Sequence, residues 1–139
     1  MEGPDLAPRE DAPATGRLLG IGIDSVDLDR LAETLRRRPR LVDRLFTEHE
    51  RAYAGRMANP VATYAGRFAA KEALMKSLGV GLGSLDWWDV EVRRRPSGRP
   101  ALVVRGRAAD LADRLGVRSW QVSITHTDTV ASAVVAALG

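Results

Sequence analysis

The stretch that decides the fold is residues 64–83, YAGRFAAKEALMKSLGVGLG. Just before it, Asn59 and Pro60 are typical of a helix start, because an Asn side chain caps free amides and Pro fits the first turn. Gly79 stands where a residue in the left-handed conformation commonly ends a helix. The sequence therefore predicts one long helix over residues 59–78.

This predicted helix carries apolar residues on two of its sides. Large side chains fall within about a third of the circumference, and alanines line a second strip. The large residues are Tyr64, Phe68, Leu74, Met75 and Leu78, and the alanines are Ala65, Ala69 and Ala73. A helix of this kind packs on both sides, so we expect it at the centre of the domain.

Four charged residues are set into the same helix: Arg67, Lys71, Glu72 and Lys76. A carboxylate on a mostly buried helix must be paired, hydrogen-bonded or bound to a metal, which makes Glu72 a candidate functional residue. The alternative is an ordinary i,i+4 ion pair between Glu72 and Lys76. Residues 79–83 (GVGLG) follow, and their backbone amides can approach a ligand closely or can simply form a cap and turn.

Composition narrows the class of protein. A chain of 139 residues with 45% hydrophobic residues fits one globular domain with a real core. The absence of cysteine excludes disulfides and thiolate metal sites, and it fits a reducing cytoplasm. No apolar run approaches the roughly 20 residues that a membrane helix needs. We therefore expect a cytoplasmic protein without a membrane partner.

Charge is distributed unevenly along the chain. Residues 1–15 hold four acidic residues against one Arg, a net charge of −3, so residues 16–139 carry +6 of the total of +3. We predict a disordered acidic tail over residues 1–15 and a single basic domain over residues 16–139. A basic domain favours phosphorylated ligands, acidic proteins or nucleic acid as partners. Nucleic acid is the weakest of these, because no aromatic residues are interleaved with the basic ones.

The order of predicted elements favours an α+β domain with a mainly antiparallel sheet packed against the long central helix. The elements are a strand over residues 18–24, a helix over 27–38, a short helix over 47–57, the long helix, a hairpin of strands 88–94 and 101–105, a helix over 107–115, and a second hairpin of strands 121–127 and 129–137. The short helix is predicted from residues 47–50 (TEHE), which match a capping box between Thr47 and Glu50. Gly20 and Gly22 weaken the first strand unless another backbone packs close to it.

An arginine-rich face follows the first strand. It consists of Arg30, Arg36, Arg37, Arg38, Arg40 and Arg44, against which only Glu33 and Asp43 are set. Such a cluster is either a solvated surface or a docking site for an acidic partner.

Polar residues at the ends or packed faces of apolar elements suggest a metal site. Asp24 ends the first strand, Glu72 lies in the long helix and His126 ends a later strand. Two carboxylates without cysteine suit Mg²⁺, which usually also binds substrate phosphates. Arg67, Lys71, Lys76 and the amides of residues 79–83 are suitable phosphate ligands. Asp24 as a helix cap and His126 as a structural residue remain the alternatives.

Four segments together resemble the holo-acyl-carrier-protein synthase family, the short single-domain class of 4′-phosphopantetheinyl transferases. They are residues 20–24 (GIGID) with Arg30 six residues on, residues 67–76 (RFAAKEALMK), residues 79–81 (GVG), and residues 122–127 (VSITHT). The match is in order and runs from Leu18 to the C-terminus. Many members have a second Ser before the His where this chain has Thr125.

The resemblance implies transfer of the phosphopantetheine arm of coenzyme A to a serine of an apo acyl carrier protein. It implies Asp24 and Glu72 as Mg²⁺ ligands and, with Lys76, as the catalytic residues. Contacts to coenzyme A would come from Arg67, Lys71, Gly79, Gly81, His126 and Thr127. Arg30 and the helix after it, with Arg36, Arg37, Arg40 and Arg44, would dock the acidic carrier. Family members of this length are typically homotrimers with sites between subunits.

Three other functions remain open from the sequence. The chain could be a non-catalytic module that binds coenzyme A or a nucleotide, although two metal ligands argue against it. A nucleic-acid-binding domain is supported by the pI of about 9.9. A structural interaction protein would leave Glu72 and Lys76 as a simple ion pair. Neither a fatty-acid nor a polyketide carrier is indicated over the other.

Overall fold

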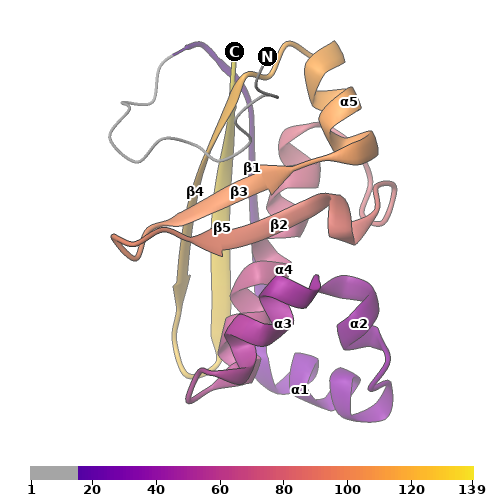
Figure 1. Cartoon of the computed structure of the whole chain (residues 1–139), viewed down its shortest axis with the longest axis vertical. Helices are drawn as coiled ribbons and strands as arrows, with labels where there is room; N and C mark the ends of the chain where they lie inside the picture. The colour runs from indigo at the N-terminus through magenta and orange to yellow at the C-terminus, as the bar shows by residue number, and fades with distance from the viewer. Residues whose placement is uncertain (1–15) are drawn as a thin grey trace.

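Helix α4 (Pro60–Ser77) is the central element of the computed structural model, which describes residues 16–139 (Figure 1). The Asn59 side chain accepts a hydrogen bond from the Ala62 amide at 3.2 Å, and Pro60 occupies the first turn. Beyond the helix, Gly79 has φ +73°, the left-handed conformation expected there. The predicted helix and both of its end signals are confirmed.

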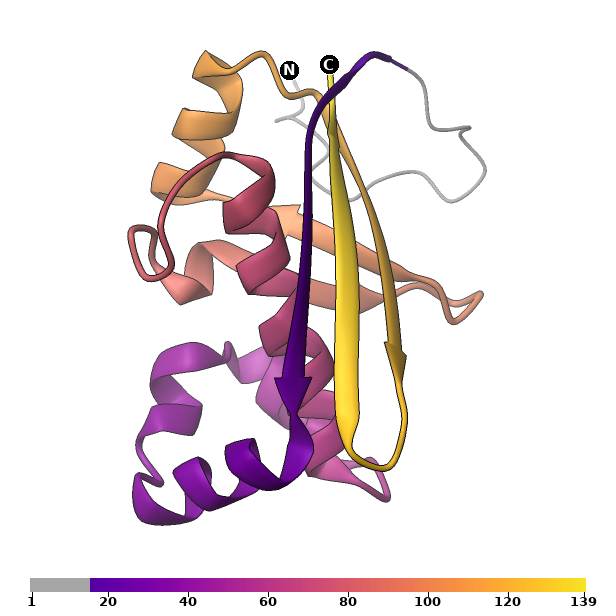
Figure 2. The same ribbon diagram turned by 180° about the vertical axis from the view of Figure 1, so that it is seen from behind.

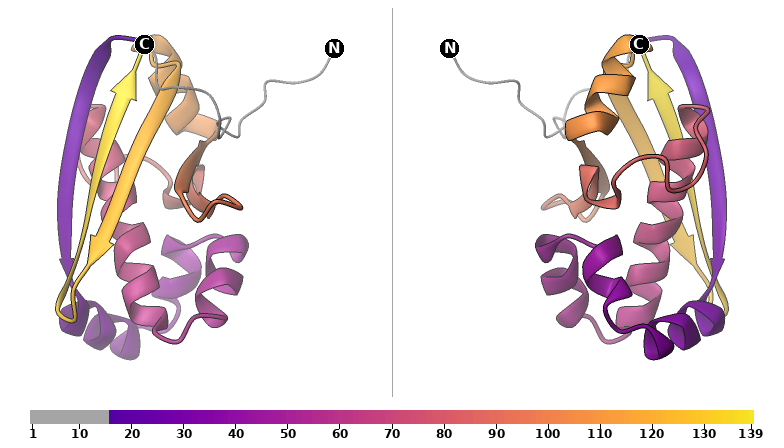
Figure 3. Two further views of the ribbon diagram at one scale, coloured as in Figure 1. Left: turned by 90° about the vertical axis from the view of Figure 1, so that its left-hand side faces the viewer. Right: turned by 90° about the vertical axis from the view of Figure 1, so that its right-hand side faces the viewer.

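A three-stranded antiparallel sheet covers one side of α4, in the order β1-β5-β4 (Figure 3). The strands are β1 (Leu18–Asp27), β4 (Ser119–His126) and β5 (Val130–Leu138). Along β5 every second residue is buried against the helix, as the period of a half-covered strand requires: these are Ala131, Ala133, Val135 and Ala137.

The backbones of β1 and α4 lie in direct contact. A Cβ atom added to Gly20 would stand 1.9 Å from the Ser77 carbonyl oxygen, and one added to Gly22 would stand 1.9 Å from that of Ala73. Only glycine leaves room for so close an approach. The expectation that another backbone packs against these glycines is therefore confirmed.

A second, two-stranded sheet lies on the other side of α4 (Figures 1 and 3). It is the hairpin of β2 (Val90–Arg94) and β3 (Pro100–Val104), preceded by the 3₁₀ turn η1 (Trp87–Asp89) and followed by α5 (Gly106–Arg114). Apolar side chains from both sheets and from α4 form one core, which includes the fully buried Leu74, Met75, Val90, Val92 and Val135.

Three short helices lie at the end of the molecule that holds the N-terminal half of α4 (Figure 1). They are α1 (Leu28–Arg37), α2 (Leu41–Leu45) and α3 (Glu48–Gly55). Helices α1 and α3 pack on α4, and α2 packs on α3 and η1. Asp27 caps α1 through the Arg30 amide at 2.8 Å. At α3, the predicted capping box is present, because Thr47 and Glu50 bond reciprocally to each other's amides.

The predicted fold class is confirmed, with four differences in detail. The first strand continues to Asp27, so Asp24 lies within β1 rather than at its end. The antiparallel strands form two sheets rather than one. The strand expected from residue 88 begins at Val90, because the Asp86 side chain caps the Trp88 amide at 2.9 Å and turns residues 87–89 into η1. Helix α2 was not predicted, since five residues carry too little periodicity to be recognised.

Two further predictions concern the acidic tail and the absence of a membrane-spanning helix. The proposed acidic tail, residues 1–15, lies outside the described residues. Within residues 16–139, no helix has the length and apolar composition that crossing a membrane requires.

We predict that Gly22→Ala destabilises the fold by about 1–3 kcal/mol, because its methyl group would collide with helix backbone that cannot move aside alone. Urea unfolding measures the change. The control is Gly81→Ala, where the described chain places nothing within 4 Å of an added Cβ. Equal stability of the two variants would show that β1 and α4 do not make this contact.

Candidate active site

Asp24 points from β1 toward α4. Side chains two residues apart on a strand share a face, so Asp24 lies on the same side as Gly20 and Gly22. Its Oδ1 accepts a hydrogen bond from the Lys76 Nζ at 3.1 Å, and the same ammonium donates to the Ile23 carbonyl oxygen at 3.2 Å. The Lys76 side chain remains 46% exposed, so its charge is also available to a ligand.

The Glu72 carboxyl lies against Asp24, one helical turn before Lys76. Burial, a hydrogen bond with Asp24 and the negative charge of Asp24 raise the pKa of Glu72 to about 8, while Lys76 opposes the shift. Two carboxyls this close disfavour simultaneous ionisation unless a further positive charge joins them. The site therefore has the electrostatic character of a cation site.

The donor set of this pair fits a hard divalent cation. Both ligands are carboxylate oxygens from rigid elements, β1 and α4. Among residues 16–139, no third His, Asp or Glu completes a ligand cluster with them. A cation held here would keep positions free for water or ligand phosphates, which is how Mg²⁺ is usually bound.

Lys71 does not face this site, which corrects its expected role as a phosphate contact. Its side chain is fully buried, and Nζ donates to Glu50 Oε1 at 2.7 Å and to the Trp87 carbonyl oxygen at 2.8 Å. Consecutive helical residues point about 100° apart, so Lys71 faces α3 and η1 while Glu72 faces β1. An ammonium with two buried partners is not available to a ligand.

Arg67 is buried beside Tyr53. Its guanidinium stands over the Tyr53 ring, 4.3 Å from the centroid, and the residue is only 3% exposed. Nε and Nη2 have no hydrogen-bond partner among the described residues, and desolvation lowers the pKa of Arg67. Two unpaired buried N–H groups are unusual, and they are suited to an anionic ligand.

His126 and Thr127 lie at the far edge of the sheet. His126 ends β4 and is exposed, and Thr127 Oγ1 accepts from the Thr129 and Val130 amides at 3.2 and 3.1 Å. Because β5 separates β4 from β1, the two edge strands are about 10 Å apart. A single chain does not bring His126 to Asp24.

The glycines after α4 lie close to Lys76 in sequence. Gly79 and Gly81 are both exposed, and Gly81 is not constrained by packing within the described chain. The Gly79 amide donates to the Lys76 carbonyl oxygen at 3.0 Å as part of the left-handed cap of α4, so Gly81 is the better placed of the two to offer its amide to a ligand.

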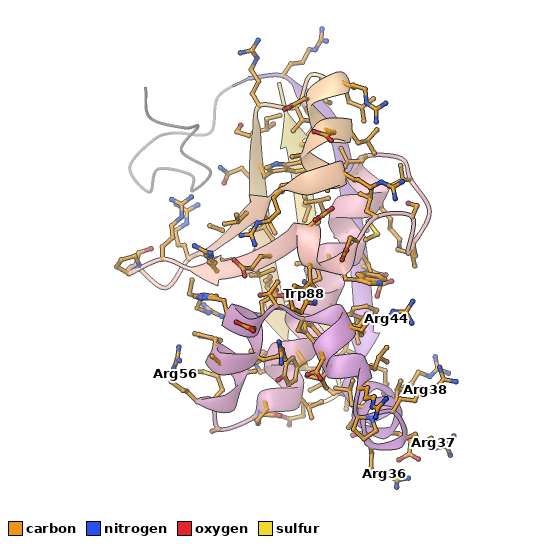
Figure 4. All side chains as sticks on the ribbon, turned by 45° about the vertical axis from the view of Figure 1, so that its right-hand side comes forward. Arg36, Arg37, Arg38, Arg44, Arg56 and Trp88 are labelled. Atoms are coloured by element: carbon orange, nitrogen blue, oxygen red, sulfur yellow. The ribbon has the colours of Figure 1, made fainter. Side chains whose placement is uncertain are left out.

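The arginine-rich face is exposed, as expected. Arg36, Arg37 and Arg38 project from the end of α1 and Arg44 projects from α2 (Figure 4). Glu33 Oε1 accepts from Arg36 at 2.7 Å and from Arg37 at 2.9 Å, and the Arg36 bond is the main cause of the lowered pKa of Glu33. Arg30 and Arg40 are also exposed.

Sequence reasoning missed Glu50, the buried partner of Lys71, and Tyr53, the half-buried ring against Arg67. Glu50 was predicted only as the third residue of a capping box, a role that it also fills. The apolar neighbours of Lys71 on α4, Phe68, Leu74 and Met75, were the available signal that this ammonium needs a buried carboxylate.

Comparison with known sequences identifies the class of protein. The model of the 4′-phosphopantetheinyl transferase superfamily matches residues 20–135. The holo-[acyl-carrier-protein] synthase of Streptomyces avermitilis is 48% identical over 122 residues, which are 88% of this chain and 98% of that protein. The synthase of Moorella thermoacetica is 45% identical over 117 residues, 84% of this chain and 91% of that protein.

Solved structures agree with the sequence comparison. The holo-[acyl-carrier-protein] synthase of Neisseria meningitidis superimposes with a TM-score of 0.82 at 25% identity, covering 88% of this chain and all of that one. The Bacillus anthracis synthase, solved in complex with CoA (3′,5′-ADP), gives 0.73 at 32% identity, with 88% and 97% covered. The Helicobacter pylori synthase in complex with coenzyme A gives 0.71 at 28% identity, with 84% and 98% covered.

The chain therefore belongs to the 4′-phosphopantetheinyl transferase superfamily. The relatives that it matches along nearly their whole length are holo-[acyl-carrier-protein] synthases. The family resemblance predicted from the sequence motifs is confirmed.

Without a bound cation, Glu72→Gln is expected to stabilise the fold at high pH. The pKa of Glu72 is about 8 when folded, against an ordinary 4.5, so the folded state binds more protons in this window. Its stability therefore falls as the pH rises from about 4.5 to about 8. Gln has no proton to lose, so we expect an advantage on the order of 1–2 kcal/mol at pH 9, after solvent screening, that vanishes near pH 4.

Urea unfolding in EDTA across this pH range measures the difference. The control is Glu48→Gln at the exposed Glu48, whose effect should not follow the same pH profile. An effect of Glu72→Gln that is independent of pH would mean that Glu72 and Asp24 do not share this site.

Proposed function

We propose that this protein transfers the 4′-phosphopantetheine arm of coenzyme A to a serine of an apo acyl carrier protein, releasing adenosine 3′,5′-bisphosphate. Relatives of 45–48% identity bear the corresponding name. The observation that carries the proposal is the meeting of Asp24, Glu72 and Lys76 on facing elements. A binding module would have no use for two opposed carboxylates that destabilise each other.

We further propose that Asp24 and Glu72 hold Mg²⁺. The raised pKa of Glu72 supports this, because a cation between the carboxyls would relieve their repulsion. When bound, Mg²⁺ would neutralise charge on the coenzyme A pyrophosphate.

Lys76 has a separate role in the proposed reaction. As the serine oxygen forms its bond to the β-phosphorus, the pyrophosphate bond breaks and negative charge collects on the departing phosphate. The half-exposed Lys76 ammonium lies beside the carboxylates and would stabilise that charge. Its bonds to Asp24 and to the Ile23 carbonyl oxygen hold it ready without consuming all of its donors.

We assign the remaining contacts to coenzyme A to Arg67 and to exposed groups of the loop after α4 and of the end of β4. Arg67 offers two unpaired N–H groups, although at 3% exposure a phosphate would reach them only after neighbouring side chains moved. The amides of Gly79 and Gly81 and the side chains of His126 and Thr127 are exposed. Lys71 is withdrawn from this set because it is buried.

We propose a homotrimer with sites between subunits. The outer face of the three-stranded sheet is uncovered (Figure 2), and Ile21 and Ile23 of β1 are 62% and 66% exposed there. An exposed apolar face on a sheet favours an interface. Since one chain keeps His126 away from Asp24, a site built from two copies would let both contact one ligand.

The carrier would dock on the arginine-rich face, where exposed positive charge complements an acidic protein. Arg40 and Arg44 are the better anchors, because Glu33 already pairs with Arg36 and Arg37. We place the reaction in the cytoplasm, in fatty-acid or polyketide biosynthesis, the two routes that use such carriers.

The transfer reaction is tested by intact-mass spectrometry of an apo acyl carrier protein incubated with this protein, coenzyme A and Mg²⁺. We expect a mass gain of one phosphopantetheine arm that is lost with EDTA and reduced at least about 10²-fold in Glu72→Gln and Asp24→Asn. Glu48→Gln is the control and should retain full activity. Coenzyme A binding without any mass gain would favour the binding-module alternative.

The docking proposal predicts that Arg40→Glu raises KM for the carrier about fivefold, since reversing a surface charge costs on the order of 1 kcal/mol. Initial rates at low and high salt measure this, and high salt should diminish the effect. Arg114→Glu, on α5, is the matched control. An unchanged KM, or equal effects of both variants, would place docking elsewhere.

The trimer is tested by light scattering of the purified protein. We expect a mass three times that of the 15.1 kDa chain, and the chain mass alone for Ile21→Glu, which would bury a charge in the interface. Leu82→Glu is the control, because Leu82 is similarly exposed, at 54%, but lies in the loop after α4. A monomeric native protein would contradict the proposed assembly.

A further inference from the structure

We propose that the buried ion pair of Glu50 and Lys71 is a positioning device, which fixes the rotation of α4 and so holds Glu72 against Asp24. This inference rests on the proposed function, because it assigns the pair a part in shaping that site. Neither residue touches the site, so both would be positioning residues rather than catalytic ones.

The pair connects four elements at one buried point. Lys71 Nζ on α4 donates to Glu50 Oε1 on α3 at 2.7 Å and to the Trp87 carbonyl oxygen of η1 at 2.8 Å. Glu50 Oε1 also accepts from the Thr47 amide, and Oε2 accepts from the Val92 amide of β2, both at 3.0 Å. Both side chains of the pair are 0% exposed.

These bonds have defined directions and are fully buried. On the other side of the helix, α4 presents its backbone to Gly20 and Gly22, and the directional bonds there, from Lys76 to Asp24 and to the Ile23 carbonyl oxygen, come from a side chain that is 46% exposed. The backbone contact brings the two elements close but resists rotation weakly. The bonds of Lys71 to two separate acceptors resist it directly.

A small rotation would matter at the site. A carboxylate roughly 6 Å from the helix axis moves about 1 Å when the helix turns by about 10°. A misplacement of about 1 Å can reduce a rate about 10²-fold. Lys71 immediately precedes Glu72, so restraint of one residue is transmitted to the next through the shared helical backbone.

The Glu50–Lys71 pair acts on Glu72 by fixing its position and not by an electrostatic effect on its carboxyl group. The charged groups that shift the pKa of Glu72 are Asp24 and Lys76, both at the site itself. A buried ion pair also adds little net stability compared with apolar residues of the same size, but its directional bonds can select one arrangement. Stability alone therefore does not account for this pair.

The test compares Lys71→Met with the control Glu91→Gln. Glu91 belongs to the same buried network, accepting from Thr47 Oγ1 at 2.6 Å, but its other partners are Arg93 and Arg105 rather than groups on α4. Two quantities are measured where circular dichroism shows each variant folded: kcat with an apo carrier, and Mn²⁺ affinity of the protein without substrates, by electron paramagnetic resonance.

We expect Lys71→Met to lower kcat at least about tenfold and to weaken Mn²⁺ binding at least about threefold, with KM for the carrier unchanged. Glu91→Gln should leave kcat and Mn²⁺ affinity near native values, even if it unfolds at a lower temperature. Native values of both quantities in Lys71→Met would overturn the proposal and leave the pair a purely structural feature. Equal losses in both variants would overturn it as well.

The double variant Glu50→Gln, Lys71→Met covers the case in which the single variant does not fold, because it leaves no unpaired buried charge. It should fold and still show the reduced kcat and Mn²⁺ affinity; native values in it would overturn the proposal. If the native protein fails to modify any carrier, the proposed function fails, whereas the Mn²⁺ comparison still decides the positioning role.

Discussion

The close contact between the backbones of β1 and α4 is the constraint on which the rest of the structure depends. With side chains larger than hydrogen at Gly20 and Gly22, the helix could not lie against the strand at this distance. The same approach brings Asp24, two residues further along β1, to Glu72 and Lys76 on α4. Because the acidic pair depends on this backbone contact, fold and site have a common origin in two glycines.

Helix α4 is held differently on its two sides. One side is a smooth surface of small residues against the three-stranded sheet, and the other is a core that includes a fully buried ion pair. The first side brings the backbones together, with Lys76 as its half-exposed polar link to β1, and the second side adds hydrogen bonds that are fully buried. This division explains why a single helix can carry Lys71 and Glu72 as neighbours with entirely different surroundings.

The sequence was sufficient for the features that depend on local pattern. The limits of α4, the capping box at Thr47 and the need for a close backbone at Gly20 and Gly22 were all predicted and confirmed. The two candidate metal ligands, Asp24 and Glu72, also come together as expected. In these cases the residue types and their spacing within one segment of the chain are enough to predict the structure.

What the sequence could not give depends on contacts between distant segments. Lys71 resembles a phosphate ligand until its partner is known, and Glu50, 21 residues away, is recognisable only as a helix cap. The alternation of β1 from Gly20 onward adds a further consequence. Inserting one residue before Asp24 would turn the carboxylate outward and an isoleucine inward against the helix. The stretch from Gly20 to Asp24 is therefore under a parity rule: the register shift between Leu18 and Gly20 precedes the residues that face α4, whereas the same shift among them would exchange the two faces of the strand.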